Sequence, residues 1–477
     1  MTIAPHAPSD QHQGNDIVPS SPRYWKAYAL SRLATPALFA DIELTETATS
    51  LVVAETYHDA RLLIRVHACP VGYVDITVEP GEILHYNRIL SALGPDTIER
   101  AANHLVADLA AANISHVQLD LSLRNLLEQA AAAQLQCKHA GSATESSITV
   151  AVCTHDRVQT LDDTLASLEK QTYGNFEVIV VDNAPGNDAT KRLVRSRYPH
   201  MRYIHEPRKG LNNARNRAIT EACGDIIAFI DDDAIADSHW VQAIGAAFDS
   251  HDVMCVTGLV APARLDTPGQ ELFERYGYSK SFYRLAFTLK SPPPACLGFP
   301  YNGYLGTGCN SAFRRAMFEH VGVFDPRLDM GTPVPGGGDH DMFARIIRAG
   351  YTLAYDPRPV VFHNHLSDLN TVIARLGAYQ EAFFAFMTKS VLSDRAYALP
   401  LLKHLSYWYI RRTVRSLASS ILKQKRPLAL VVSEAIGAWR GPISYYRSSR
   451  QWYANMRRDD KLALERLHIP SKSNHKS

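Results

Sequence analysis

The hydrophobic residues after residue 147 form a repeating pattern of short apolar runs and helix-spaced leucines. Continuous apolar runs, which are typical of strands buried on both faces, occur at residues 148–152, 176–183 and 225–233. A stretch with leucines three and four residues apart separates the first two runs. This alternation predicts an α/β domain with a Rossmann-like, mostly parallel sheet.

The same pattern divides the chain into five parts. Residues 1–21 are polar and proline-rich, which predicts a disordered tail. Residues 22–136 contain short β-like runs followed by two helical stretches, which predicts a small α+β accessory domain. The polar, small residues 137–147 predict a linker. We then expect the α/β domain over residues 148–366 and a helical, basic region over residues 367–477.

The second half of the α/β domain differs from the first. Residues 258–340 contain clusters of Pro and Gly, and we expect them to form loops that shape a binding site. Residues 339–350 predict a helix, because acidic residues stand near its start and Gly follows its end. Residues 352–357 and 359–365 predict two short strands.

Composition indicates a soluble globular protein. The chain has 477 residues, 46% hydrophobic and 21% charged, with a net charge of +2. Its apolar runs fall short of the ~20 residues of a membrane-spanning helix, and its N-terminus lacks the features of a secretory signal. Seven cysteines without a CxxC pair indicate reduced thiols, so we expect a cytoplasmic protein.

Positive charge is concentrated near the C-terminus. Residues 403–458 contain twelve Lys or Arg residues and one acidic residue, Glu434, with Trp and Tyr residues among them. A solvated helical face that packs on the α/β domain explains this pattern. The alternative is an interfacial surface for anionic lipid headgroups or polyprenyl phosphate. Nucleic acid is a weaker third option, and we do not expect it as a partner.

Three adjacent carboxylates end the run at residues 225–233. Asp231, Asp232 and Asp233 repel one another, so they stay ionised at low cost only beside a cation. Oxygen ligands suit Mn²⁺ or Mg²⁺, which commonly share their coordination shell with a diphosphate. Surface acids at the start of a helix explain these residues equally well in isolation, but two further polar strand ends favour the metal.

Those further strand ends carry Asp156 and Asp182. In sheets of this type ligands bind at the carboxyl ends of the strands, where carboxylates accept hydrogen bonds from a nucleobase or a ribose. Arg215, near the start of the helix that follows Gly210, can face the same nucleotide. Taken alone, each residue is explained about equally well as an ordinary turn, cap or solvated side chain.

Taken together, the motifs resemble those of the family 2 inverting glycosyltransferases, which have the nucleotide-sugar-binding GT-A fold. The shared segments occur in the family's order between about residues 148 and 365: TVAVCTHDR, VIVVDN, GLNNARNRAI, FIDDDA, GTGCNSAFRR, GGGDHDMFARI and VVFHNH. The resemblance covers less than half of the chain. It leaves residues 1–136 and the basic C-terminal region without a counterpart.

The resemblance implies roles by position. Nucleotide-sugar binding is implied for polar residues at the strand ends and nearby, namely Thr154, Asp156, Arg157, Asp182, Asn183, Arg215, Asp231 and Asp232. Binding of Mn²⁺ or Mg²⁺ is implied for the DxD motif and two late histidines, namely Asp231, Asp233, His363 and His365, with Asp233 as the likelier direct ligand. Asp339 matches the general base that takes the proton of the acceptor hydroxyl.

The base position departs from the family pattern. Many members carry Glu-Asp there, whereas this chain has Gly338-Asp339, so Asp341 is a rival for the catalytic role. Two residues apart on a helix, the two side chains point about 200° apart, and only one can face the acceptor. A helix cap and a first-turn acid also explain the pair.

The implied reaction is a single displacement that inverts the anomeric carbon. The expected acceptor is a polysaccharide, a glycolipid or a lipid-linked sugar, and the Gln-x-x-Arg-Trp signature of processive synthases is absent. The enzyme is expected at the inner face of the plasma membrane if the basic region binds lipid. Two alternatives remain open: a sugar-1-phosphate nucleotidyltransferase, and a non-catalytic nucleotide-sugar-binding protein that is indifferent to the replacement of Asp339.

Overall fold

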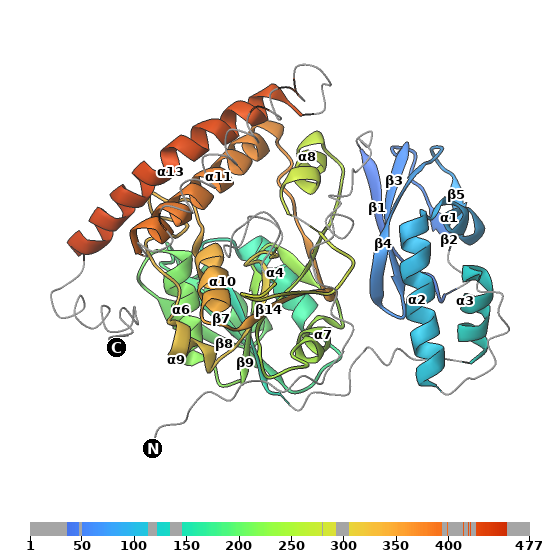
Figure 1. Ribbon diagram of the computed structural model, residues 1–477, viewed down its shortest axis with the longest axis horizontal. Coiled ribbons are helices and arrows are strands. Elements are labelled where there is room, and N and C mark those ends of the chain that lie inside the picture. Colours follow the sequence, from blue (N-terminus) through green and yellow to red (C-terminus); the bar gives the residue numbers. More distant parts are fainter. Residues whose placement is uncertain are drawn as a thin grey trace.

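A central α/β domain lies between a small N-terminal unit and two long C-terminal helices (Figure 1). The computed structural model describes residues 36–46, 50–112, 122–133, 146–278, 280–291, 305–393, 398, 414, 418, 420 and 426–455. The predicted tail and most of the predicted linker lie outside the described residues.

The α/β domain is built on a nine-stranded mixed sheet. Its order is β10-β14-β11-β13-β9-β6-β7-β8, with β12 paired to β14. Strands β9, β6, β7 and β8 run parallel to one another, and β13 joins β9 to β11 with antiparallel pairing on both sides. The strands are β6 (Ile148–Thr154), β7 (Phe176–Asn183), β8 (Arg202–Glu206), β9 (Ile226–Asp231), β10 (Ala234–Ala236), β11 (Val253–Pro262), β12 (Leu285–Phe287), β13 (Asn310–Arg314) and β14 (Thr352–His363).

Helices cover both faces of this sheet. The helices of the domain are α4 (Val158–Leu168), α5 (Ala189–Arg197), α6 (Leu211–Glu221), α7 (Trp240–Ala247), α8 (Pro268–Tyr276), α9 (Met317–Val321) and α10 (Gly338–Arg348). On one face α4 and α7 bury Leu161 and Trp240 against the strands, and on the other α6 and α10 bury Ala214 and Phe343. The parallel strands are therefore apolar on both sides, which explains their continuous hydrophobic runs.

Two predictions for the second half of the domain were wrong in detail. Residues 258–340 are not loops throughout, because they contain the second half of β11 together with α8, β12, β13 and α9, elements too short to give a clear period. The two strands predicted at 352–357 and 359–365 are one strand, β14. Its prolines, Pro357 and Pro359, lie where the pairing with β11 shifts register, so the missing N–H groups cost no ladder hydrogen bonds there.

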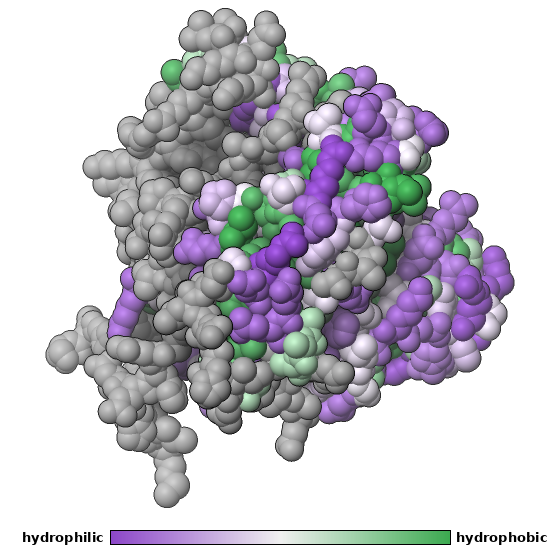
Figure 2. Space-filling model, turned by 90° about the vertical axis from the view of Figure 1, so that its right-hand side faces the viewer, coloured by the Kyte–Doolittle hydropathy of each residue, from purple (hydrophilic) through white to green (hydrophobic). Residues whose placement is uncertain are grey.

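The N-terminal unit combines a three-stranded sheet with helices. Strand β3 pairs in parallel with β1 and antiparallel with β4, while β2 and β5 form a separate pair. The elements are β1 (Ala37–Glu43), β2 (Ser50–Val52), β3 (Asp59–Val66), β4 (Cys69–Thr77), β5 (Ile83–His85), α1 (Tyr86–Ala92), α2 (Pro95–Ala111) and α3 (Leu123–Ala132). The described residues on the face seen in Figure 2 are mostly hydrophilic, with smaller hydrophobic patches among them.

The N-terminal sheet packs directly against the α/β domain. Tyr73 on β4 contacts Phe282 edge-to-face, in a cluster with other buried apolar residues of both units. Arg61 lies 3.7 Å from Glu274 on α8, and Arg65 lies 3.0 Å from Asp237 beyond β10. Both arginines are buried, so the ion pairs and the apolar contacts join the two units in one interface.

Two long helices complete the described chain, in agreement with the predicted helical C-terminal region. Helices α11 (Leu369–Ser393) and α13 (Leu428–Asn455) pack along each other (Figure 1). They approach closely at Gly377 and Gly437, where a Cβ on Gly437 would lie 2.1 Å from the Gly377 carbonyl oxygen. Among the described residues, none of the helices has both the length and the apolar character needed to cross a bilayer.

Candidate active site

A cavity of about 440 Å³ opens at the carboxyl ends of β6, β7 and β9. It is lined by nine of the residues singled out in the sequence: Thr154, Arg157, Asn183, Arg215, Asp231, Asp232, Asp233, Asp339 and His363. The fold therefore brings together side chains from four strand ends and two helix starts. The other four candidates, Asp156, Asp182, Asp341 and His365, are not part of its lining.

The acidic triplet is held in place by two residues of the β6–α4 turn. Asp232 is buried, and its carboxylate accepts hydrogen bonds from Thr154 Oγ1 at 2.7 Å and from Arg157 at 3.1 Å. Arg157 also donates to Asp233 at 3.0 Å. Thr154 and Arg157 thus fix the orientation of the carboxylates that end β9.

Negative charge exceeds positive charge around Asp231. Burial raises the pKa of Asp231 to about 7; Arg215 opposes this shift, and the carboxylates of Asp233, Asp232 and Asp339 add to it. Arg215 lies 3.9 Å from Asp231 and stacks over aromatic rings, which holds its guanidinium at the wall of the cavity. Crowded carboxylates with one nearby guanidinium are the environment that a divalent cation relieves.

A chain of hydrogen bonds runs from a buried carboxylate to His363. Glu274 Oε2 lies 3.1 Å from His365 Nε2, and His365 Nδ1 lies 2.9 Å from His363 Nδ1. Burial would raise the pKa of Glu274, but Lys280, His365 and Arg61 outweigh it and lower the value to about 2. Glu274 is therefore ionised and can only accept, so His365 donates to it through Nε2.

The tautomers of His365 and His363 follow from the ionised state of Glu274. Burial lowers the pKa of both histidines, that of His363 to about 4, so both are neutral at pH 7. With Nε2 of His365 protonated, its Nδ1 accepts from the Nδ1–H of His363. This leaves the lone pair of His363 Nε2 at 3.4 Å from Asp233 Oδ1, another acceptor. Two acceptors that face each other in this way fit a shared metal cation.

The residues present therefore fit a divalent metal. Carboxylate oxygens from Asp231 and Asp233 and the neutral imidazole of His363 form a mixed donor set that suits Mn²⁺ and also accommodates Mg²⁺. His365 lies behind His363 and orients it through the hydrogen bond at 2.9 Å. The geometry thus separates the two histidines that the sequence left equivalent: His363 faces the cavity, and His365 supports it.

Asp339 reaches the cavity from the start of α10. Its Oδ2 accepts from the Gly308 N–H at 3.2 Å, and its Oδ1 accepts from the His340 N–H at 2.9 Å. Burial would raise the pKa of Asp339, but His340 and Arg215 outweigh it and hold the value below its usual range. The carboxylate is ionised at neutral pH, which is the state that a general base needs.

Glycines before Asp339 explain the departure from the family pattern. Gly336 and Gly337 have φ values of 137° and 95°, a region that favours glycine, and they turn the chain into α10. A Cβ on Gly338 would lie 2.2 Å from the amide nitrogen of Asn212, which donates to two backbone carbonyls. A glutamate at this position would require Asn212 to move.

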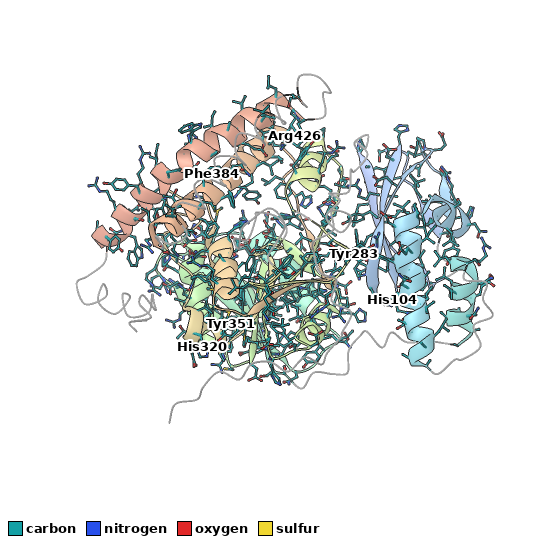
Figure 3. All side chains as sticks on the ribbon, in the orientation of Figure 1. His104, Tyr283, His320, Tyr351, Phe384 and Arg426 are labelled. Carbon is teal, nitrogen blue, oxygen red and sulfur yellow. The ribbon has the colours of Figure 1, made fainter. Side chains whose placement is uncertain are left out.

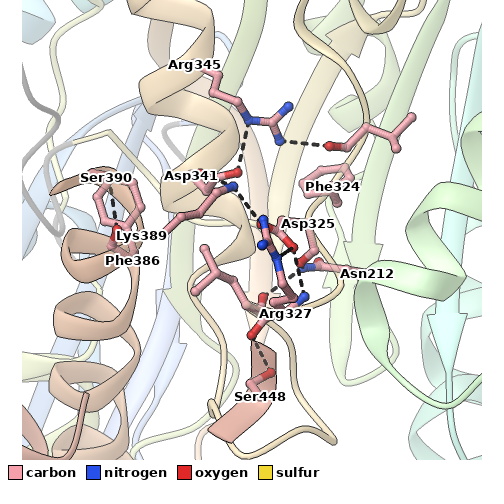
Figure 4. A network of polar contacts seen from close by, with 12 residues as sticks. Asn212, Phe324, Asp325, Arg327, Asp341, Arg345, Phe386, Lys389, Ser390 and Ser448 are labelled. Atoms are coloured by element: carbon pink, nitrogen blue, oxygen red, sulfur yellow. Dashed lines mark hydrogen bonds and ion pairs between the residues drawn. The ribbon is translucent and has the colours of Figure 1, made fainter. Parts of the chain in front are cut away.

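Asp341 lies on the opposite side of α10, in a buried network of ion pairs (Figure 4). Its carboxylate is 2.7 Å from Lys389 and 3.0 Å from Arg345, and Lys389 also contacts Asp325 at 2.8 Å. Burial would raise the pKa of Asp341, but Lys389 and Arg345 outweigh it and lower the value. Asp341 thus anchors α10 to α11, and Asp339 is the carboxylate that faces the cavity.

Asp156 and Asp182 make structural contacts beside the cavity. Asp156, with φ of 54°, accepts from the Gly186 N–H at 3.1 Å and so holds the loop after β7. Asp182 is fully buried and accepts from Tyr203 Oη at 2.8 Å. Burial raises the pKa of Asp182, and its Oδ1 has no hydrogen-bond partner among the described residues.

Several residues of the site carry no signal in the sequence. Asp329 lines the cavity, and burial raises its pKa to about 7. Arg375 and Tyr379 reach the cavity from α11, and Glu274 acts behind the histidines from α8. These residues stand in segments without a recognisable motif, so only the folded arrangement of distant elements reveals them.

Together the fold and the cavity define an α/β domain with an acidic site at the carboxyl ends of its parallel strands. Residues 149–322 match the model of the family described as glycosyl transferase family 2. The domain that carries the site is a family 2 glycosyltransferase domain of the GT-A fold, as the motifs predicted. The matched segment includes the acidic triplet and ends before Asp339 and His363.

Curated relatives match over less than half of the chain. The succinoglycan biosynthesis protein ExoM of Rhizobium meliloti is 27% identical over 219 residues, which are 44% of this chain and 64% of that protein. The glucosyl-dolichyl phosphate glucuronosyltransferase of Haloferax volcanii is 26% identical over 185 residues, 37% of this chain and 56% of that protein. The chain thus spans less than two thirds of the length of these relatives.

Among solved structures, the mannosyltransferase PcManGT of Pyrobaculum calidifontis, in complex with GDP-Man and Mn²⁺, shares 16% sequence identity with a TM-score of 0.40. The alignment covers 74% of this chain and 98% of that one.

Proposed function

We propose that this protein is a metal-dependent, inverting, non-processive glycosyltransferase that moves a sugar from a nucleotide-diphospho-sugar to a hydroxyl group. The observation that carries the proposal is one cavity with two chemically distinct sides. The acidic triplet and His363 offer a metal and diphosphate site, and Asp339 offers an ionised base on a separate element. The family of the domain supports this reading.

The residues divide the work of a single displacement. Asp231, Asp233 and His363 would hold Mn²⁺ or Mg²⁺, which when bound neutralises the charge that develops on the diphosphate leaving group. Arg157 and Arg215 place positive charge at the same wall, and the strand ends around Asn183 would border the nucleoside. Asp339 accepts the proton of the attacking hydroxyl as that oxygen bonds to the anomeric carbon. Attack opposite the leaving group inverts that carbon.

Donor binding is tested first by thermal shift. We expect one of UDP-, GDP- or dTDP-sugar, together with Mn²⁺, to raise the Tm of the wild type by about 2–5 °C. Asp233→Ala should abolish the Mn²⁺-dependent part of that shift, because it removes a ligand that faces His363. Asp188→Ala is the matched control, since Asp188 is an exposed aspartate outside the cavity.

Three outcomes would contradict the proposal. Absence of a shift with every donor, with and without metal, would remove the donor site. Release of pyrophosphate from a nucleoside triphosphate and a sugar 1-phosphate would instead make the protein a nucleotidyltransferase. Donor binding without transfer to any acceptor, unaltered by Asp339→Asn, would favour the non-catalytic binding protein.

Exposed apolar side chains on the outer face of α13 support the proposal that the acceptor lies at a membrane. Seven large apolar side chains follow one another at helical spacing on this face and are exposed: Leu428, Val432, Ile436, Trp439, Ile443, Tyr446 and Tyr453. Arg440, Arg447 and Arg450 are exposed on the same helix. Apolar residues flanked by arginines suit the interface of an anionic bilayer. We therefore place the enzyme at the inner face of the plasma membrane, with a lipid-linked or cell-envelope glycan as acceptor.

Vesicle co-sedimentation tests this placement. We expect the full chain to pellet with vesicles that contain phosphatidylglycerol, and to remain in solution with pure phosphatidylcholine or at 1 M NaCl, where charge is screened over about 3 Å. Replacing Trp439 and Ile443 together by Ser should weaken pelleting at least about fivefold, since both side chains are more than half exposed. Val52→Ser, which alters an exposed apolar residue of the N-terminal unit, is the control. Equal behaviour with both kinds of vesicle would count against the placement.

A further inference from the structure

Two histidines and an aspartate meet in the N-terminal unit, outside the cavity. His67 lies in the turn between β3 and β4, and His104 and Asp108 stand four residues apart on α2, where Figure 3 labels His104. The Nδ1 of His67 is 2.6 Å and the Nε2 of His104 is 3.1 Å from the same carboxylate oxygen, Asp108 Oδ2. One donor atom from each residue thus lies within 4.8 Å of the others.

The burial of this cluster calls for a compensating charge. The side chains of His67, His104 and Asp108 are 6%, 12% and 2% exposed. Among the described residues, no Lys or Arg forms an ion pair with Asp108, and its Oδ1 is buried without a hydrogen-bond partner. A buried carboxylate is costly unless it is paired or coordinates a metal.

The turn between β3 and β4, which carries His67, is held in a fixed conformation. His67 and Ala68 both have positive φ values, 49° and 64°, which non-glycine residues rarely adopt. The carboxylate of Glu43 accepts from the backbone N–H of His67 at 2.9 Å and from that of Ala68 at 2.7 Å. The turn is therefore held in a conformation that aims the imidazole of His67 at α2.

We propose that His67, His104 and Asp108 bind a zinc ion. Two imidazole nitrogens and one carboxylate oxygen are a common three-ligand set for Zn²⁺, which keeps its fourth position for water. The oxygen-rich cavity, in contrast, suits Mn²⁺ or Mg²⁺. Ligands ~2.0–2.1 Å from a tetrahedral ion lie about 3.3 Å from one another. Binding therefore requires His67 Nδ1 to move away from Asp108 Oδ2, from 2.6 Å to about that separation, whereas His104 Nε2, at 3.1 Å, needs to move little. The ion would join α2 to the β3–β4 turn and so brace the accessory unit.

Metal content of the purified full-length chain tests this site. Without chelator, we expect about one zinc per chain by mass spectrometry, and less than about a fifth of that in His104→Ala and Asp108→Asn. His85→Ala is the matched control, because His85 is an exposed histidine of the same unit. Asp233→Ala should leave zinc content unchanged and remove the Mn²⁺-dependent donor shift, which separates this proposal from the proposed function.

Two further readouts guard against a variant that misfolds. Treatment of the wild type with EDTA should lower its Tm, and ZnCl₂ should restore it without any donor. CoCl₂ should give the wild type the visible spectrum of four- or five-coordinate cobalt, which His104→Ala lacks. Zinc that persists in both variants, or a wild type that binds neither Zn²⁺ nor Co²⁺ at micromolar concentration, would overturn the proposal and leave a hydrogen-bonded His–Asp–His cluster.

Discussion

Replacing Asp339 by Asn is expected to lower kcat by about 10²–10⁴-fold, the usual contribution of a general base. The amide keeps the shape of the side chain and can still accept from the Gly308 N–H, but it cannot take a proton from the acceptor. Since the change spares Asp233 and His363, the donor thermal shift should persist. Steady-state kinetics with saturating donor, together with that shift, separate lost catalysis from lost binding.

Asp341→Asn is the informative comparison, because it makes the same chemical change two residues away. Asp341 contacts Lys389 and Arg345 rather than the cavity, so this variant should lose thermal stability while its folded fraction keeps a near-normal kcat. The opposite pattern, with turnover abolished in Asp341→Asn and retained in Asp339→Asn, would make Asp341 the base. Normal kcat in both variants would remove the base from α10 altogether.

The positions of the parallel strands along the chain and the acidic triplet at the end of one of them were predictable because each depends on local sequence. Apolar runs buried on both faces are continuous, and a polar residue at the end of such a run lies at the ligand-binding edge. Helix geometry also predicted that only one of Asp339 and Asp341 can face the cavity. It did not predict which, because that depends on where Lys389 of α11 packs.

Residues that position other side chains of the site could not be predicted from the sequence, and the reason is physical. Glu274 stands in a segment that we expected to form loops, and its role follows only from a buried chain of hydrogen bonds to His365 and His363. That chain extends further, because Arg61 of the N-terminal sheet lies 3.7 Å from Glu274. The accessory unit thus contributes a charge that two side chains, Glu274 and His365, separate from the proposed metal ligand His363. No single motif encodes this link.

The second large effect is expected from Lys389→Met, which should lower Tm by roughly 5–10 °C. Lys389 is buried between Asp325 and Asp341, at 2.8 and 2.7 Å, and joins α11 to the loop before α10 and to α10 itself (Figure 4). Breaking a buried ion pair by removing one partner typically costs about 3–5 kcal/mol. The lower end applies here, because Asp325 keeps Arg327 and Asp341 keeps Arg345.

The pH dependence of this effect identifies its origin. The pKa of Asp341 is lowered in the folded state, so its ion pairs stabilise the fold above the unfolded pKa of about 3.9 and cease to do so as pH falls through the lower folded value. Scanning calorimetry from pH 7 to about pH 2.5 should therefore show a Tm difference between wild type and Lys389→Met that is constant above about pH 4 and narrows below it. The double variant, Lys389→Met with Asp341→Asn, should lose less stability than the two single variants lose in sum, by at least about 1 kcal/mol. Additive losses, or a difference independent of pH, would mean that Lys389 acts through packing of its methylene chain and not through its charge.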